Sequence, residues 1–373
     1  MRVLITNYCL TTRSGTELYV RDLALELRRQ GHTPAVYASW LGPIAEELSA
    51  AGIPVTDSPA RLDFPPDIIH GHHRHETLAA VLRFPSAPAL FICHSHIGWI
   101  EKPPFHSRII RYFGVSGLCV ERLRASGVPS NRIGRLYNFV DLQRFSPRPP
   151  LPASPRRALV FSNYATNQTY LPAVAEACKR AGMELSAVGA GVGNSVERPE
   201  EILGQYDIVF AKGRAAMEAM AVGNAVILCD FGGVGPMVAS SNFERLRPMN
   251  FGFQALTETH TPENVLRKIA CYDAQDAGKV GEQLRSCAGL NHAVAELAGI
   301  YRQTVDEYQS RGAVRGGLRD MGCFATEARF RLIYGALRLW RSIPQEKRQA
   351  INNHHGLGAI KRGIQSVLCG RAR

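Results

Sequence analysis

The chain contains two runs of alternating strand and helix signals, separated by a proline-rich segment. Short and almost continuously apolar stretches predict strands, and apolar residues three or four positions apart predict the helices between them. Strands of this kind are typical of parallel sheets that are covered by helices on both faces. The first run starts at residue 2, and the second starts at residue 158. A chain of 373 residues suits two domains better than one core. We therefore predict an α/β protein with two doubly wound, Rossmann-like domains that face a cleft.

The two runs predict a similar set of elements. In the first run, we expect a helix around residues 18–27 and another around 44–51. In the second run, we expect helices at 170–181 and 215–222. The expected strands are residues 2–7, 34–39, 53–55, 67–70, 89–94, 158–162, 185–188, 208–210 and 225–229.

Four prolines within seven residues mark the boundary between the two runs. Proline lacks an amide proton and fixes φ, so this segment should run extended between two folded units. We predict domains at 1–145 and 158–310, a linker at 146–157, and a basic helical extension at 311–373.

The cysteine pattern and the apolar runs point to a cytoplasmic protein. Nine cysteines are scattered along the chain and form no Cys-x-x-Cys pair, which indicates reduced thiols. The first apolar run is too short for a signal peptide, and no run of about 18 apolar residues predicts a spanning helix.

The strongest local signal is a strand, a short turn and a small-residue helix between residues 210 and 226. The free N–H groups and positive dipole end of such a helix suit a pyrophosphate. Lys212 and Arg214 would add charge-assisted hydrogen bonds, and Glu218 can accept both hydroxyls of a ribose. In the alternative interpretation, Glu218 only supports the helix terminus and the two cations are solvated.

Histidines gather after two of the predicted strands, at His70, His72, His73 and His75 and again at His94 and His96. Such a cluster suggests a metal site, but no Asp or Cys completes a tight ligand set. We expect no bound metal ion.

Four short motifs lie in a fixed order on the two sides of the linker. They are Ser14-Gly15-Thr16-Glu17, Phe91-Ile92-Cys93-His94, Asn138-Phe139-Val140-Asp141 followed by Phe145-Ser146-Pro147, and Glu218-Ala219-Met220-Ala221-Val222-Gly223. In this order, from residue 1 to about 308, the chain resembles the GT-B glycosyltransferases of the GT4-like group, which use nucleotide-diphospho-sugars.

The resemblance implies a hexosyltransferase that moves a sugar from a nucleotide-diphospho-sugar to a lipid-linked or cell-envelope glycan. It implies no cofactor besides this co-substrate, and no metal. It also assigns His94 as the catalytic group that positions the acceptor hydroxyl, with His72 and His96 on the acceptor side. The donor-binding residues that it implies are Glu218, Arg214, Lys212, Gly213, Ala215, Gly15 and Gly233.

Two positions depart from the family pattern. Phe210 stands where the family usually has the first glutamate of a pair, and the loop 162–168 lacks the usual phosphate-binding cations. A GT-B-like protein that binds nucleotide or glycan without catalysis is therefore an alternative. An epimerase on the same fold would need a nearby acid and base, and no such carboxylates are identified.

The carboxyl-terminal extension carries most of the charge. The net charge of the chain is +12, and +10 of it follows residue 310. A basic amphipathic helix suits an anionic membrane surface, but it can also pack across the first domain with its arginines in water. Sparse aromatic stacking positions argue against nucleic acid. The residues of the predicted helical face are Phe330, Ile333, Tyr334, Leu337 and Trp340, with Arg331, Arg338 and Arg341 beside it.

Overall fold

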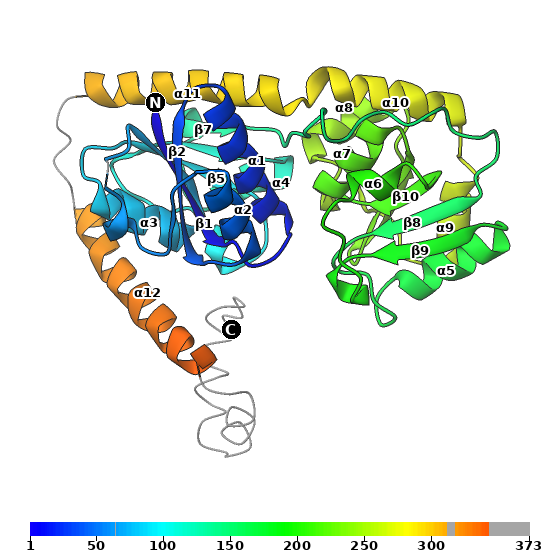
Figure 1. Cartoon of the computed structure of the whole chain (residues 1–373), viewed down its shortest axis with the longest axis horizontal. Helices are drawn as coiled ribbons and strands as arrows, with labels where there is room; N and C mark the ends of the chain where they lie inside the picture. The colour runs from blue at the N-terminus through cyan, green and yellow to red at the C-terminus, as the bar shows by residue number, and fades with distance from the viewer. Residues whose placement is uncertain (64, 312–317, 343–373) are drawn as a thin grey trace, which may run out of the picture.

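The computed structural model describes residues 1–63, 65–311 and 318–342, and it contains two α/β domains (Figure 1). The first domain has a seven-stranded sheet in the order β3-β2-β1-β4-β5-β6-β7, in which all neighbouring strands are parallel. Its elements are β1 (Arg2–Cys9), α1 (Gly15–Arg29), β2 (Thr33–Trp40), α2 (Pro43–Ala50), β3 (Val55–Thr56), η1 (Pro59–Arg61), β4 (Ile68–His72), α3 (Arg74–Arg83), β5 (Ala89–Cys93), η2 (Trp99–Glu101), β6 (Ile109–Gly114), α4 (Gly117–Ala125), η3 (Ser130–Arg132) and β7 (Ile133–Arg135).

The second domain has a five-stranded sheet in the order β12-β11-β10-β8-β9, in which only β12 is antiparallel to its neighbour. Its strands and helices are β8 (Arg157–Phe161), α5 (Leu171–Arg180), β9 (Glu184–Val188), η4 (Ala190–Val192), α6 (Glu200–Leu203), β10 (Ile208–Ala211), α7 (Gly213–Val222), β11 (Ala225–Asp230), β12 (Gly233–Met237), α8 (Phe243–Leu246), η5 (Arg247–Met249), η6 (Phe253–Ala255), α9 (Pro262–Ile269) and α10 (Ala274–Cys287). The arrowheads of β8 and β9 point toward the first domain, so strand ends of this sheet face the space between the domains (Figure 1).

The predicted pair of Rossmann-like sheets is confirmed, with differences in four strands. The strand expected at 53–55 is the two-residue β3, and β6, β7 and β12 were not predicted. Arg111 interrupts the apolar run of β6, and it is tolerated because its guanidinium pairs with Glu307 of α11 (Leu290–Ser310) at 2.9 Å.

The chain crosses between the domains twice. After β7 it passes through the proline-rich segment to β8, and after α10 on the upper side of the second domain it returns in α11, which runs along the upper side of the first domain in Figure 1. Leu290, Val294, Leu297 and Tyr301 of α11 belong to the core of the first domain, although their sequence position placed them in the predicted second domain.

The two crossings are tied to each other at the hinge. The backbone N–H of Val140 donates to Ala288 O at 2.8 Å, and the N–H of Leu290 donates to Val140 O at 2.9 Å. Arg285 adds hydrogen bonds to the carbonyl oxygens of Leu142 and Phe145.

The long helix α12 (Leu318–Ser342) lies against α3 of the first domain, and its far end extends beyond that domain (Figure 1). Phe330 and Tyr334 are buried and Ile333 is half-buried, while the side chains of Leu337, Trp340, Arg338 and Arg341 lie outside the described residues. Packing across the first domain, one of the two predicted alternatives, is thus found for Phe330 and Tyr334. No helix in the described ranges combines the length and the apolar character that crossing a bilayer requires.

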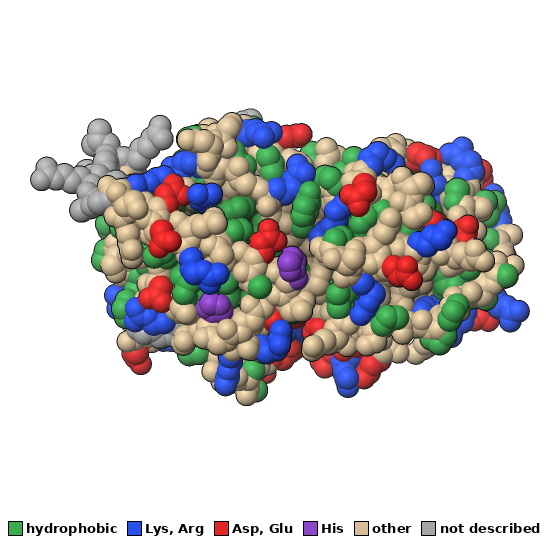
Figure 2. All heavy atoms as spheres, turned by 90° about the horizontal axis from the view of Figure 1, so that it is seen from above, with side chains coloured by type: hydrophobic (Ala, Val, Ile, Leu, Met, Phe, Trp, Pro, Cys, Tyr) green, Lys and Arg blue, Asp and Glu red, His purple; other side chains and the backbone are tan. Residues whose placement is uncertain are grey.

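Figure 2 shows the face of the molecule on which α11 lies. Acidic and basic side chains are interspersed on this face and do not gather into a patch of one sign. This mixture agrees with the small net charge of +2 before residue 311.

Candidate donor and acceptor site between the domains

Arg214 pairs with two buried carboxylates, one in each domain. Its Nε lies 2.7 Å from Glu218 Oε1 on the same helix, and its Nη2 pairs with Asp22 of α1 in the first domain. Asp22 in turn pairs with Arg21 at 2.6 Å. All four side chains are less than a tenth exposed, so this interdomain ion cluster (Arg21, Asp22, Arg214 and Glu218) is shielded from solvent.

The electrostatics of the interdomain ion cluster follow from burial and from the shared guanidinium groups. Burial raises the pKa of Glu218, and the attraction of Arg214 only partly opposes this. Burial acts in the same sense on Asp22, but Arg214 and Arg21 together hold its pKa below the ordinary value. Arg214 Nη1 is buried without a hydrogen-bond partner among the described residues. The cluster therefore keeps one cationic N–H edge that an anionic ligand can use.

Lys212 stands at the N-terminus of α7. Its Nζ lies 2.7 Å from Asp230 Oδ2 and 4.6 Å from the ring centre of Phe253. The following N–H, from Gly213, donates to Phe251 O at 2.8 Å, and Gly213 has a φ of 58° in the region that favours glycine. The N–H of Gly213, the first of α7, therefore already has a partner within the protein. The N–H groups of α7 that remain for a ligand come after Gly213. Ala215 lies half-buried in this first turn.

Three aromatic rings surround Lys212 on the second domain. Tyr164 and Phe231 are 55% and 44% exposed, and their ring centres are 5.2 Å apart. Phe231 also lies 5.0 Å from Phe253, edge to face. Tyr164 comes from the cation-free loop 162–168, and sequence reasoning missed this cluster because its members come from three separate loops. Exposed rings beside a cation suit the stacking of a sugar or a base.

The two glycines assigned to the donor have different surroundings. No heavy atom lies within 4 Å of a Cβ placed on Gly15, so the start of α1 borders open space. Gly233 has a φ of 145°, and a Cβ there would lie 2.7 Å from Glu258 O. The hairpin between β11 and β12 therefore already requires glycine at position 233, whatever else this glycine does.

The histidines form a buried stack. The ring of His72 lies between His70 and His94, with ring centres 4.7 and 4.6 Å away. Tyr19 packs on all three rings, and Tyr301 shares a hydrogen bond of 2.7 Å with His70 Nδ1. His72 is 0% exposed, and neither of its ring nitrogens has a partner among the described residues. The ring of His72 is therefore enclosed by its neighbours and is not open to solvent.

His94 is the member of this stack that is not fully enclosed. Burial lowers the pKa of His94 to about 4, which keeps its ring neutral at pH 7. Its Nε2 has no partner among the described residues. A neutral ring with a free nitrogen can accept a hydrogen bond or a proton from an acceptor hydroxyl.

Sequence reasoning also missed Glu101, which holds the loop after β5. Its Oε2 accepts the backbone N–H of His94 at 3.0 Å, and its Oε1 lies 3.6 Å from His73 Nε2. The N–H of Tyr8 donates to His73 Nδ1 at 2.9 Å, so the proton of His73 lies on Nε2 and faces Glu101. His73 has a φ of 60°, a strained value for a residue with a side chain.

His96, which was predicted on the acceptor side, lies next to a residue of the predicted donor-binding domain. Its ring centre lies 5.6 Å from that of Phe253 in the second domain. Burial lowers the pKa of His96, and the positive charges of Arg122 and Lys212 add to the effect. Among the described residues, no group of three or more His, Cys, Asp or Glu side chains is arranged to hold a metal ion.

Comparison with known proteins agrees with this architecture. Residues 13–144 match the family model of Glycosyltransferase Family 4. One similar solved structure is a glycosyltransferase from Rickettsia africae ESF-5, with 16% identity and a TM-score of 0.60 over 82% of this chain and 98% of that chain. The Anabaena protein HepE in complex with UDP and glucose has 13% identity and a TM-score of 0.58 over 80% of this chain and 99% of that chain. Sucrose-phosphate synthase from Thermosynechococcus elongatus has 14% identity and a TM-score of 0.53 over 81% of this chain and 98% of that chain. No curated protein sequence matches the chain. The chain therefore shares its fold with these glycosyltransferase structures, and residues 13–144 resemble Glycosyltransferase Family 4.

Proposed function

We propose that the protein transfers a sugar from a nucleotide-diphospho-sugar to a glycan or lipid-linked glycan acceptor, without a bound metal ion. The observation that carries this proposal is a pair of contacts across the domain interface: Arg214 pairs with Asp22, and His96 packs on Phe253, the ring beside Lys212. Anabaena HepE has been solved in complex with UDP-glucose, so uridine donors are the first to test. Attachment to an anionic membrane through residues 311–373 and a cytoplasmic location stay predictions.

The donor would bind at the start of α7. Arg214 Nη1 and Lys212 would contact the diphosphate, whose negative charge grows as the sugar leaves, and Glu218 would accept the ribose hydroxyls. Lys212 can turn from Asp230 toward the phosphates because its side chain is still a fifth exposed. Tyr164 and Phe231 would then pack against the donor.

The acceptor would be positioned by the first domain. His94 would hold the attacking hydroxyl at its Nε2, and Glu101 would fix the backbone that carries His94. Closure of the two domains around both substrates would exclude water and limit hydrolysis of the donor.

Binding without catalysis is the second candidate, and the placement of Phe210 favours it. The side chain of Phe210 is fully buried in the core of the second domain, so this position offers no polar group to the cleft. Calorimetry with UDP-, GDP- and ADP-sugars, combined with product detection, separates the two candidates. Binding without turnover for every donor and acceptor offered would favour the second.

Lys212→Ala is expected to weaken donor binding about 10- to 100-fold, because it removes one charge-assisted hydrogen bond to the diphosphate. Glu218→Ala should weaken it further, since it also leaves Arg214 without its partner on α7. Titration calorimetry with the donor of the parent protein measures both. Lys179→Ala, on the exposed side of α5, is the control. If both site variants bind and transfer like the parent, the proposed function is wrong.

Glu101→Gln is expected to lower turnover about tenfold and to leave donor affinity unchanged, because Glu101 positions His94 without touching the donor. The charge of Glu101 raises the pKa of His94, so its removal should move the acid limb of the pH–rate profile to lower pH. Steady-state kinetics between pH 4 and 8 test this. Glu121→Gln, at an exposed site of α4, should leave the profile in place. An unshifted profile in Glu101→Gln would contradict the positioning role.

A further inference from the structure

The middle of α12 covers an edge of the first domain where several strands end. Tyr334 packs on Tyr8 near the end of β1 and on Trp40 at the end of β2, with ring centres 5.9 and 6.2 Å apart. Ligands of doubly wound sheets bind at this carboxyl edge. Helix α12 thus lies on the edge where the acceptor is expected.

Phe330 of α12 stacks on Trp99, which directly follows the His94 loop. The ring centres are 5.1 Å apart and the planes differ by 16°. His75, in the first turn of α3, packs on Phe330 at 5.0 Å and on Tyr334 at 4.7 Å. We call the surface that Phe330 and Tyr334 cover the aromatic slot, and define it by Tyr8, Trp40, His75 and Trp99.

The aromatic slot contains polar groups that packing against a helix does not need. Trp99 Nε1 and His75 Nδ1 have no hydrogen-bond partner among the described residues. Beside them, Glu76 is buried with a pKa that burial raises to about 7, and Ser39 donates to its Oε1 at 2.5 Å. Aromatic faces mixed with a few unused polar atoms are typical of ligand sites. They fit a pyranose ring, which has C–H faces and hydroxyl edges.

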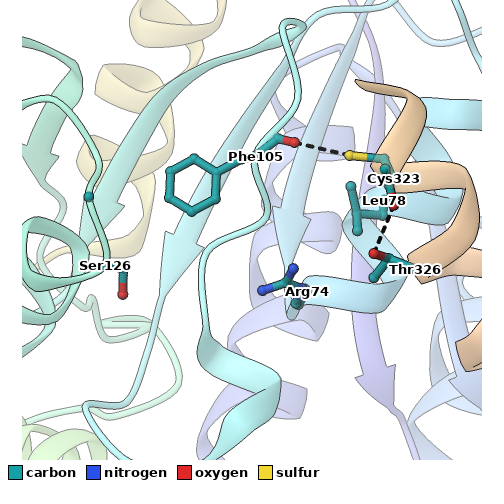
Figure 3. A pocket seen from close by; sticks show the side chains of 8 residues that line it. Arg74, Leu78, Phe105, Ser126, Cys323 and Thr326 are labelled. Atoms are coloured by element: carbon teal, nitrogen blue, oxygen red, sulfur yellow. Dashed lines mark hydrogen bonds between the residues drawn. The ribbon is translucent and has the colours of Figure 1, made fainter. Parts of the chain in front are cut away.

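One turn further back, α12 leaves a cavity of about 420 Å³ between itself and the domain (Figure 3). Arg74, the first residue of α3, lies in this cavity, and its guanidinium makes no ion pair or hydrogen bond to the described residues (Figure 3). The side chains that line the cavity are Arg74, Leu78, Phe105 and Ser126 from the domain and Cys323 and Thr326 from α12. An unpaired cation in a cavity is suited to an anionic group.

We propose that the aromatic slot and the Arg74 cavity form one acceptor subsite for an acidic glycan, and that α12 occupies it until such a glycan displaces the helix. A sugar ring would replace Phe330 on Trp99, and a carboxylate or phosphate of the glycan would pair with Arg74. This inference rests on the proposed function for the identity of its ligand as an acceptor. The subsite begins beside the reaction centre, because Glu101, two residues after Trp99, binds the backbone of His94.

The attachment of α12 is compatible with release of its middle. Near its start, Asp320 accepts hydrogen bonds from Ser107 N at 2.9 Å and Ser107 Oγ at 2.5 Å, and Cys323 Sγ donates to Phe105 O at 3.0 Å. The aromatic contacts of Phe330 and Tyr334 come about two to four turns later. The helix can therefore swing from its fixed start while Phe330 and Tyr334 leave the slot.

Hydrogen exchange of residues 318–342 in the full-length protein tests the proposal without any donor or turnover. Trigalacturonic acid, an acidic trisaccharide, is expected to raise the exchange rate of α12 at least tenfold, and neutral maltotriose is expected to raise it much less. Sodium acetate at the same carboxylate concentration is the control, and it should have no effect on the exchange rate of α12. Arg74→Gln should remove the advantage of the acidic sugar. Equal release by acetate, or no release by either sugar at millimolar concentration, would overturn the subsite.

A double variant tests the covering role of α12 separately. Phe330→Ala with Tyr334→Ala should expose α12 to exchange without sugar and bind trigalacturonic acid about tenfold more tightly than the parent. Phe324→Ala with Leu332→Ala, on the exposed side of the same helix, is the matched control and should change neither property. A released helix without tighter sugar binding would contradict the proposal. Because these readouts need only binding, a failure of sugar transfer would affect the proposed function alone.

Discussion

Arg214→Ala is expected to lower the free energy of unfolding by about 3 to 5 kcal/mol. The substitution leaves Glu218 buried without a cation and leaves Asp22 with Arg21 as its only partner in the cluster. A buried carboxylate without a partner carries the full cost of its lost hydration. Urea unfolding at pH 7.5 measures the change. Because Asp22 and Arg214 belong to different domains, small-angle scattering should also show a larger radius of gyration.

Two controls distinguish loss of charge pairing from loss of packing. Arg180→Ala removes an exposed arginine with carboxylate partners on α5 and α9 and should leave stability unchanged. Arg214→Met combined with Glu218→Gln should recover most of the lost stability, because Asp22 keeps Arg21 as its partner and no other charge of the cluster stays unpaired. A loss below about 1 kcal/mol for Arg214→Ala would mean that the interdomain ion cluster is not shielded from water.

Acidification from pH 7 to pH 5 is expected to weaken the fold through the histidine stack. Burial lowers the pKa of His70 to about 3 and that of His94 to about 4. Between pH 6.5 and these values the unfolded chain binds more protons than the folded chain. The contribution of the two neutral histidines to the free energy of unfolding is therefore fully present above pH 6.5 and is lost as the pH falls. Each of these two histidines should remove about 2 kcal/mol at pH 5.

Variants isolate this effect from Glu76, which acts in the opposite sense because burial raises its pKa to about 7. His70→Phe should reduce the difference in stability between pH 7 and pH 5 by about 2 kcal/mol. His72→Phe should also reduce it, and at little cost at pH 7, because the ring nitrogens of His72 have no partners among the described residues. His292→Gln, at an exposed site of α11, is the control. If His70→Phe and His72→Phe keep the pH dependence of the parent, the stack is not the acid-sensitive element.

The sequence predicts the architecture well because local patterns decide most of it. The alternation of apolar strands and amphipathic helices reports burial on both faces of each sheet, and the structure confirms it. The motif around Glu218 predicts a strand, turn and helix, found as β10 and α7. Strand β6 was missed because the charged Arg111 lies in it and finds its partner on a distant helix.

The contacts of the candidate site could not be predicted because they join distant parts of the chain. Asp22 and Arg214 are 192 positions apart, and no local pattern indicates that they meet. Glu101 gives no signal in the sequence, since its role depends on how the loop after β5 folds back on His94. Position in the sequence also placed α11 with the second domain, whereas its apolar face belongs to the core of the first.

The paired crossings at the hinge restrict how the two halves of the molecule can move. Both connections pass through one small region, where the backbone of Val140 forms hydrogen bonds with Ala288 and Leu290 in the connection between α10 and α11. Two tethers that meet at a point permit rotation about that point and resist translation. Opening and closing should therefore be a hinge rotation of the two domains about this region. A single backbone cleavage in the segment 146–157 would leave the domains joined through the connection to α11.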